Sequence, residues 1–240
     1  MIFAAGLGTR LKPLTDSMPK ALVPVDGKTL LDITINRLVA AGATEIVVNI
    51  HHFGEQIIAH LQRHSYPVPV RISDERSELL DTGGGLRQAV PLFGAPDGPV
   101  LLHNVDILHN ADLSAFCAAS DASGVTLMVS DRPTSRYLLF DDDLRLVGWT
   151  NVQTGEVRSP YDALDITSLR RYAFSGIHCF SPAVFPLLQD WPSRFPIMDF
   201  YLRECARIPI KAWPVEGLRL LDVGKTDSLS AATEFLKSMS

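Results

Sequence analysis

The sequence has no excess of positive charge and no long hydrophobic run. Its 240 residues include 22 Lys and Arg against 27 Asp and Glu, which gives a formal net charge of -5. Nucleic acid and anionic membranes are bound by basic surfaces, so this balance favours neither partner. No apolar stretch approaches the ~20 residues that cross a bilayer. A small, phosphate-rich substrate stays compatible with the composition, because a few local cations and a metal can outweigh the net charge.

Cysteine is scarce, and no secretion signal is recognisable. Cys117, Cys179 and Cys205 are widely spaced and odd in number, which favours buried thiols over a disulfide framework or a zinc site. Residues 1–5 are apolar but run directly into a glycine turn at Gly6, without the basic segment and cleavage site of a signal peptide. These features predict a cytoplasmic protein.

The first 130 residues alternate between two hydrophobic patterns. Short apolar, β-branched runs predict buried strands at residues 1–5, 44–50, 68–72, 100–105 and 125–129. Helical spacing predicts helices at residues 29–41, 54–64 and 112–122, and another after the glycine run 83–85. Such alternation is typical of a doubly wound α/β sheet with right-handed connections.

The second part of the chain has a different character. Residues 137–140 and 144–149 predict an antiparallel pair around an acidic turn, and residues 151–171 predict a loop on the substrate side. Further expected elements are a strand at 173–180, helices near 182–188 and 198–206, two strands within 208–223, and a closing helix from Thr226.

The densest motif, AAGLGTRLKPLT, runs from Ala4 to Thr15 and is followed by MPKALVPV from Met18 to Val25. Gly6 and Gly8 allow the backbone to approach a triphosphate and to direct N–H groups at its oxygens. A Gly-x-Gly step alone is compatible with an ordinary tight turn, but the complete string is not typical of one. The motif therefore predicts a phosphate-binding loop.

Two cations flank this loop. Arg10 offers a planar fork for phosphate oxygens, and Lys20 offers a mobile point charge. A dinucleotide-binding fingerprint is the alternative for a glycine turn after a strand, but it needs a third glycine or alanine where Leu11 stands. Pro13 and Pro19 also argue against the helix that such a fingerprint begins.

The string resembles the signature of the sugar-1-phosphate nucleotidyltransferases, A-A-G-x-G-T-R-L-x-P-L-T followed by P-K-x-L-x-P-V. The resemblance implies a three-layer, Rossmann-like (GT-A-like) α/β fold with a predominantly parallel mixed sheet. It implies one domain over residues 1–240, with a nucleotide-binding half at 1–130 and a sugar-binding half with the C-terminal helix at 131–240. It also implies catalytic roles for Arg10 and Lys20 and nucleotide contacts from Ala4, Ala5, Gly6, Gly8 and Thr9.

Two aspartates stand at or just beyond the ends of apolar strands. Asp106 follows LLHNV, and Asp222 follows LRLL. From position alone either could be a cap or a surface acid; the resemblance implies that both hold Mg²⁺, a metal that prefers few protein oxygens beside phosphate and water. The family usually has glycine where Val105 stands and tryptophan where Leu220 stands, so contacts around the metal and sugar are expected to differ.

A third motif, Thr82-Gly83-Gly84-Gly85, could be a plain helix-entry loop. The matching family segment holds the nucleobase, and this version resembles that of N-acetylmuramate 1-phosphate uridylyltransferases, which favours UTP and assigns Thr82, Gly83 and Gly84 to the nucleotide. Within these 240 residues we expect no C-terminal β-helix like that of the bifunctional acetyltransferase relatives.

Candidate sugar contacts are fewer. Asn104 is adjacent to the Val105–Asp106 step, and Ser175-Gly176 resembles the family position where a glycine backbone meets the hexose. Asp199 is a candidate for the rim of the site. His51 and His52 are expected to be loop histidines, because no further ligand stands at a spacing that suits a metal.

The sequence therefore predicts a Mg²⁺-dependent transfer of a nucleotide from a nucleoside triphosphate to a sugar 1-phosphate, with release of pyrophosphate. The alternatives are another reaction of the same family, with guanylyl, thymidylyl or cytidylyl transfer, and a non-catalytic protein that senses nucleotide sugars. A glycosyltransferase is disfavoured, because only the first acid of an Asp-x-Asp step is present. Residues 131–172, with Arg132, Arg136 and Arg158, are expected to set acceptor choice; nothing in the sequence indicates the oligomeric state.

Overall fold

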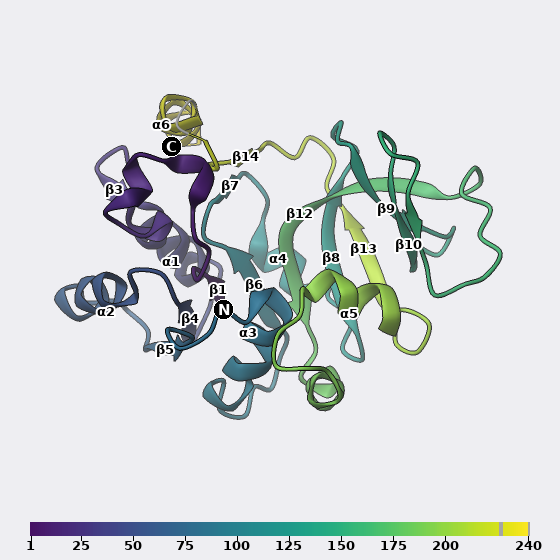
Figure 1. Ribbon diagram of the computed structural model, residues 1–240, viewed down its shortest axis with the longest axis horizontal. Coiled ribbons are helices and arrows are strands. Elements are labelled where there is room, and N and C mark those ends of the chain that lie inside the picture. The colour runs from purple at the N-terminus through teal and green to yellow at the C-terminus, as the bar shows by residue number, and fades with distance from the viewer. Residues whose placement is uncertain (226–227, 240) are drawn as a thin grey trace.

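The fold is built on one mixed sheet. The computed structural model describes residues 1–225 and 228–239 (Figure 1). Its central strands run in the order β5 (Val70–Asp74), β4 (Ile46–Ile50), β1 (Ile2–Phe3), β6 (Val100–Asn104), β12 (Arg170–Phe180), β8 (Val125–Ser130) and β13 (Ile210–Pro214). Only β12 is antiparallel to its neighbours there. The expected α/β class with a mostly parallel mixed sheet is confirmed.

A small antiparallel arm extends this sheet, at the right of Figure 1. It consists of β9 (Arg136–Phe140), β10 (Leu146–Asn151) and β11 (Val157–Arg158). The arm is joined to the sheet by pairing of β9 with the first residues of β12, Arg170–Tyr172. The predicted antiparallel pair is confirmed, and the expected loop at 151–171 contains the short strand β11.

Helices cover both faces of the central sheet. One face packs against α1 (Leu30–Ala40), α2 (Gly54–Arg63), α4 (Leu113–Ala118) and α6 (Ser228–Lys237), and the other against α3 (Asp81–Ala89), α5 (Ile197–Glu204) and the 3-10 helix η5 (Pro182–Asp190). Successive strand residues alternate between the two cores: Ile2 lies in the first and Phe3 in the second. This alternation produces the expected three layers. The predicted start of the closing helix, Thr226, lies outside the described residues.

The segment after β1 forms no long helix. It folds into three short 3-10 turns, η1 (Thr9–Leu11), η2 (Leu14–Asp16) and η3 (Lys20–Leu22). A hairpin follows, in which β2 (Pro24–Val25) and β3 (Lys28–Thr29) flank an Asp26-Gly27 turn with positive φ at both residues. The prolines of this segment account for the interruption of helical structure, as the sequence predicts.

The glycine run corrects one expectation. The helix does not begin after Gly83–Gly85 but at Asp81, so the glycines lie inside α3. A Cβ at Gly83 would stand 2.2 Å from the Phe195 ring, and one at Gly84 would stand 2.1 Å from the Ser193 carbonyl oxygen. The amides of both glycines also donate to the Phe195 carbonyl oxygen. The glycines therefore allow a loop to pack directly on the helix.

Candidate active site

A cleft of about 280 Å³ opens at the carboxyl ends of β1 and β6, where open α/β sheets bind ligands. Most of the predicted site residues line it: Ala4, Gly6, Gly8, Thr9, Arg10, Lys20, Thr82, Asn104 and Asp106. An adjoining cavity of about 190 Å³ shares Gly6 and Thr82 with the cleft and is also lined by Ala5 and Glu75. The two spaces together form an elongated site.

Two short strands bring the distant aspartates together. β7 (Ile107–His109) pairs antiparallel with β14 (Leu220–Asp222), and Asp222 stands opposite Ile107. The Val223 amide donates to the Asp106 carbonyl oxygen at 2.8 Å, which closes this pairing beside the cleft. The sequence does not predict β7, because three residues carry too little periodicity to be recognised as a strand.

The two aspartates and the two predicted cations form one ionic cluster. Lys20 Nζ contacts Asp106 Oδ2 and lies 3.9 Å from Asp222 Oδ1, while an Arg10 guanidinium nitrogen lies 3.6 Å from Asp222 Oδ2. The Lys20 side chain is only 11% exposed, whereas that of Arg10 is 61% exposed. Lys20 is thus fixed between the carboxylates, and Arg10 can turn toward an incoming anion.

The two glycines of the loop, Gly6 and Gly8, are required for different reasons. Gly8 has φ of +64°, and a Cβ there would lie 3.0 Å from the Thr15 methyl carbon. Thr15 Oγ1 also donates to the Gly8 carbonyl oxygen at 2.8 Å, so the fold itself requires glycine at this position. A Cβ at Gly6 would meet no protein atom, although Gly6 lines both cavities. Glycine at position 6 therefore fits the close approach of a ligand.

A buried polar pair, which no sequence motif marks, supports the loop. The Ala4 and Ala5 amides donate to Asn49 Oδ1 at 2.7 and 3.3 Å, and Asn49 Nδ2 donates to Glu75 Oε1 at 2.7 Å. Asn49 and Glu75 are almost fully buried, and burial raises the pKa of Glu75 against the opposing effect of the Asn49 hydrogen bond. An asparagine inside the apolar run at 44–50 was the available signal.

The predicted sugar residues divide into two groups. Gly176 has φ of +78°, and a Cβ there would lie 2.7 Å from Asn104 Nδ2, so this pair adjoins the cleft. Ser175 is buried, and its hydroxyl donates to the Met128 carbonyl oxygen at 2.7 Å. Its side chain holds the irregular part of β12 against β8, where the register shifts between Phe174 and His178.

Three other predicted residues have protein partners. Asp199 lies in the first turn of α5 and pairs with Arg158 at 2.7 Å, outside both cavity linings. Thr82 lines both cavities, and its hydroxyl oxygen accepts from the Ile197 amide at 2.9 Å. His51 Nδ1 is bonded to the Glu75 carbonyl oxygen at 2.7 Å. The structure thus places Asp199 at an ion pair between the arm and α5, not in the cleft.

Comparison with known proteins decides the family. Residues 1–239 match the model of the family described as Nucleotidyl transferase. The chain belongs to this family. Its reaction is the transfer of a nucleotide to a sugar 1-phosphate, which agrees with the resemblance of the glycine loop and its cations. None of the helices among the described residues is long and apolar enough to span a bilayer.

Individual relatives agree with the family. The chain is 36% identical over 229 residues to an N-acetylmuramate alpha-1-phosphate uridylyltransferase of Caulobacter vibrioides, covering 91% of this chain and 88% of the relative. It is 45% identical over 116 residues to a protein of the same name from Neisseria meningitidis serogroup B, about half of each chain. The structure of HddC from Yersinia pseudotuberculosis superposes with a TM-score of 0.76 at 22% identity, covering 98% and 97% of the two chains, which shows the shared fold.

Proposed function

We propose that the protein transfers the uridylyl group of UTP to N-acetylmuramate 1-phosphate and releases pyrophosphate. The observation that carries this proposal is the meeting of Arg10, Lys20, Asp106 and Asp222 at one cleft beside the glycine loop. The choice of uridine and N-acetylmuramate is supported by the two relatives of that name, one of which aligns over nearly the whole chain.

The reaction is an in-line displacement at phosphorus. A phosphate oxygen of the sugar 1-phosphate attacks the α-phosphorus of UTP, a new P–O bond forms, and the bond to the bridging oxygen of the β-phosphate breaks. Pyrophosphate leaves with that electron pair. The nucleophile is already an anion, so no general base and no covalent enzyme intermediate are needed. The protein contributes position and compensation of charge.

The cations of the ionic cluster provide this compensation. Arg10 presents a fork for non-bridging oxygens of the triphosphate. Lys20, which contacts Asp106 in the structure, would give up the carboxylates to the metal and turn its ammonium toward the α-phosphate. Asp106 and Asp222 supply the oxygen donors that suit Mg²⁺, and they stand close enough for Lys20 to contact both. Mg²⁺, when bound, would neutralise charge on the phosphates and orient them.

The two cavities suggest how the substrates divide the site. The triphosphate would lie against residues 6–10 in the larger cleft, and the base would enter the smaller cavity between Ala5, Glu75 and Thr82. Within this single domain, residues 1–130 would then hold the nucleotide, and residues 131–240, through Gly176 beside Asn104, would hold the sugar. We assign Ser175 and Asp199 to positioning this second half rather than to direct sugar contact.

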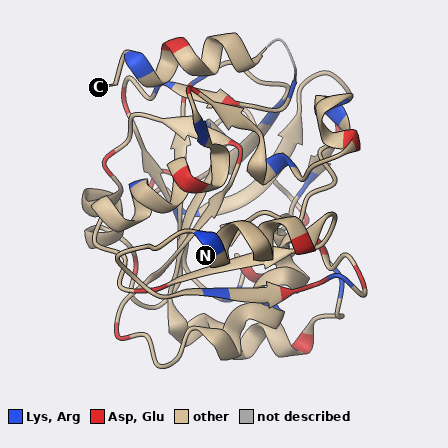
Figure 2. Cartoon of the chain, turned by 90° about the vertical axis from the view of Figure 1, so that its left-hand side faces the viewer, with Lys and Arg blue, Asp and Glu red and all other residues tan. Residues whose placement is uncertain are grey.

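The cellular setting follows from the proposed substrates. The reaction draws on a pool of nucleoside triphosphates, which supports a cytoplasmic location. A nucleotide-activated N-acetylmuramate would serve cell-wall synthesis. Lysine and arginine positions alternate with acidic ones along the ribbon in Figure 2 and do not gather in one segment.

Pyrophosphate release tests the proposal. Four nucleoside triphosphates are combined with Mg²⁺ and a panel of N-acetylmuramate, glucose and mannose 1-phosphates and phosphocholine. We expect release only with UTP and N-acetylmuramate 1-phosphate, and its loss in the double variant Asp106→Asn, Asp222→Asn. Release with another pair would keep the reaction and replace the substrates. Absence of release throughout, with nucleotide sugar still binding in calorimetry, would make the protein a sensor.

A further inference from the structure

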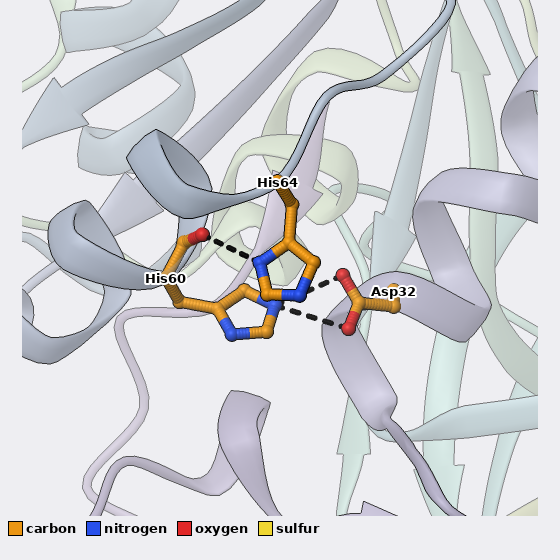
Figure 3. Close-up of side chains that lie close together, drawn as sticks. All are labelled: Asp32, His60 and His64. Carbon is orange, nitrogen blue, oxygen red and sulfur yellow. Dashed lines mark hydrogen bonds and ion pairs between the residues drawn. The ribbon is translucent and has the colours of Figure 1, made fainter.

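Asp32, His60 and His64 form a compact cluster outside the active site (Figure 3). Asp32 lies in the first turn of α1, and the two histidines lie at the end of α2. One ligand atom from each residue can be chosen so that all three lie within 4.8 Å of one another. None of the three lines either cavity of the active site.

We propose that Asp32, His60 and His64 bind a divalent transition metal, zinc foremost. His60 lies in the last turn of α2 and His64 is the residue that follows the helix, and their rings stack with centroids 4.1 Å apart. Two imidazole nitrogens and one carboxylate oxygen are a donor set that favours zinc over magnesium. The site therefore differs in chemistry from the two carboxylates of the active site.

The distances are already close to those of a coordinated ion. Tetrahedral zinc with N and O ligands separates its donor atoms by about 3.3 Å. His60 Nε2 lies 2.9 Å from Asp32 Oδ1 and 3.0 Å from Oδ2. His64 has to turn away from its stacking contact with the His60 ring, whose centroid lies 4.1 Å away. Its side chain is exposed and stands beyond the last residue of α2, so this movement is open to it. The exposed side also leaves a fourth position open to water.

The hydrogen bonds around the cluster fix the ligand atoms. His64 Nδ1 is bonded to the His60 carbonyl oxygen at 2.8 Å, so this nitrogen carries the hydrogen and Nε2 keeps its lone pair. Figure 3 shows the second nitrogen of His64 on the side of Asp32. A backbone carbonyl bonded to the other ring nitrogen is the usual support of a metal-bound histidine.

The carboxylate has matching support. Asp32 Oδ1 accepts from the Tyr66 hydroxyl at 2.7 Å, and Oδ2 accepts from the Thr29 hydroxyl at 2.7 Å. Asp32 is therefore held in one orientation by two hydroxyl groups, as a ligand must be.

Metal binding replaces the bond between His60 and Asp32. In the metal-free cluster the Nε2–H of His60 donates to the carboxylate. On binding, His60 takes the tautomer with its hydrogen on Nδ1, and the Nε2 lone pair goes to the metal. The ion then joins α1 to α2 through three coordinate bonds.

Both helices that the ion would connect also contact the segment that carries Arg10 and Lys20. The Leu30 amide at the start of α1 donates to the Val23 carbonyl oxygen at 3.1 Å, just after Lys20. Gln56 of α2 donates to the Ser17 carbonyl oxygen at 2.9 Å, in the same segment. An ion between the two helices would fix α1 and α2 relative to each other, and with them the two hydrogen bonds to the segment around Lys20.

Zinc binding to the full chain provides the test. The protein is stripped with EDTA, dialysed, and titrated with ZnCl₂ by calorimetry in excess Mg²⁺. We expect one equivalent to bind, and zinc at 100 times its dissociation constant to raise the Tm by roughly 5–10 °C. Co²⁺ in place of zinc should show the intense visible bands of tetrahedral coordination without thiolate charge transfer, which excludes the cysteines.

Variants locate the ion. His64→Ala removes an exposed side chain, so the variant should fold normally and bind zinc ~100-fold more weakly or not at all. Tyr66→Phe should weaken binding about 10-fold. His52→Ala removes a histidine of a different loop and should bind like the wild type. No binding by the wild type, or wild-type affinity in His64→Ala, would reduce the cluster to a hydrogen-bonded contact between two helices.

Discussion

At the scale of single residues, the site contains side chains of two kinds. Arg10 and Lys20 were predicted from a dense glycine-rich motif, and both residue types suit phosphate. The metal role of Asp106 was implied by the family resemblance, because its position alone also fits a cap or a surface acid. Asn49 and Glu75 were missed, because their importance depends on a contact between the ends of two strands, β4 and β5. The hydrogen-bond partner of a buried polar side chain can be identified only from the structure, because the partner is distant in the sequence.

Arg10 offers a sharp test with a matched control. Arg10→Ala should lower the rate of pyrophosphate release on the order of 10³-fold, because one cation that neutralises the phosphates is lost. Its Tm should change little, since an exposed ion pair contributes at most about 1 kcal/mol. Lys12→Ala removes a cation of the same loop that is equally exposed, at 61%, and that pairs with Asp16. Full activity in Arg10→Ala, or an equal loss in Lys12→Ala, would contradict the assignment.

At the scale of elements, the strands and helices of the central sheet were predictable, whereas the strand β7 and the start of α3 were not. The runs that became β4, β6 and β8 carry enough apolar residues to be recognised, and Gly42 correctly marks the end of α1 with φ of +92°. The three-residue strand β7 carries no such signal, although its pairing determines where Asp222 lies; its partner β14 was expected within residues 208–223. The start of α3 was misplaced because glycine is a poor helix former, and here tertiary packing outweighs that preference.

Gly84→Ala tests whether packing explains the glycines of α3. Alanine is intrinsically better in a helix by about 1 kcal/mol, yet its Cβ would lie 2.1 Å from the Ser193 carbonyl oxygen. We expect a net loss of about 1–3 kcal/mol in the free energy of unfolding, measured with urea, because backbone must move. Gly98→Ala, where a Cβ meets nothing within 4 Å, should stay within about 0.5 kcal/mol. A more stable Gly84→Ala protein would show that the contact is dispensable.

At the scale of the whole molecule, neutral histidines are built into the sheet. His103 of β6 and His178 of β12 are both buried, on neighbouring strands. Desolvation lowers the pKa of His103 to about 4 and that of His178 to about 3. His103 Nδ1 is bonded to the Asn104 carbonyl oxygen, and its Nε2 lies 3.1 Å from Nε2 of His109. This arrangement supports the backbone on which Asn104 and Asp106 stand.

The same histidines predict how stability depends on pH. Above about pH 7.5, one unit over the usual histidine pKa of about 6.5, they are neutral in both the folded and the unfolded chain and add no pH dependence. As the pH falls from 6.5 toward 4, the unfolded chain takes up protons that the folded protein excludes. Each histidine then lowers the free energy of unfolding by about 1.4 kcal/mol per pH unit.

Urea unfolding at several pH values measures this slope. His178→Phe is expected to be less stable at pH 7 but to lose about 1.4 kcal/mol less per pH unit on acidification. The carboxylates are common to both proteins, so the difference isolates the histidine. Equal slopes would mean that His178 is protonated in the folded protein as well.

The strand β12 has a consequence for how such enzymes diversify. Its end at Ile177–Phe180 pairs with β6 in the nucleotide half, while its beginning at Arg170–Tyr172 pairs with β9 of the arm. The arm is therefore attached at one end of a strand whose other end is fixed independently, and it is braced by an ion pair from Arg158 to Asp199 of α5. The sequence leads us to expect that residues 131–172 set acceptor choice. If they do, recombination among relatives in this segment would exchange the acceptor while the glycine loop and its cations keep their inherited positions.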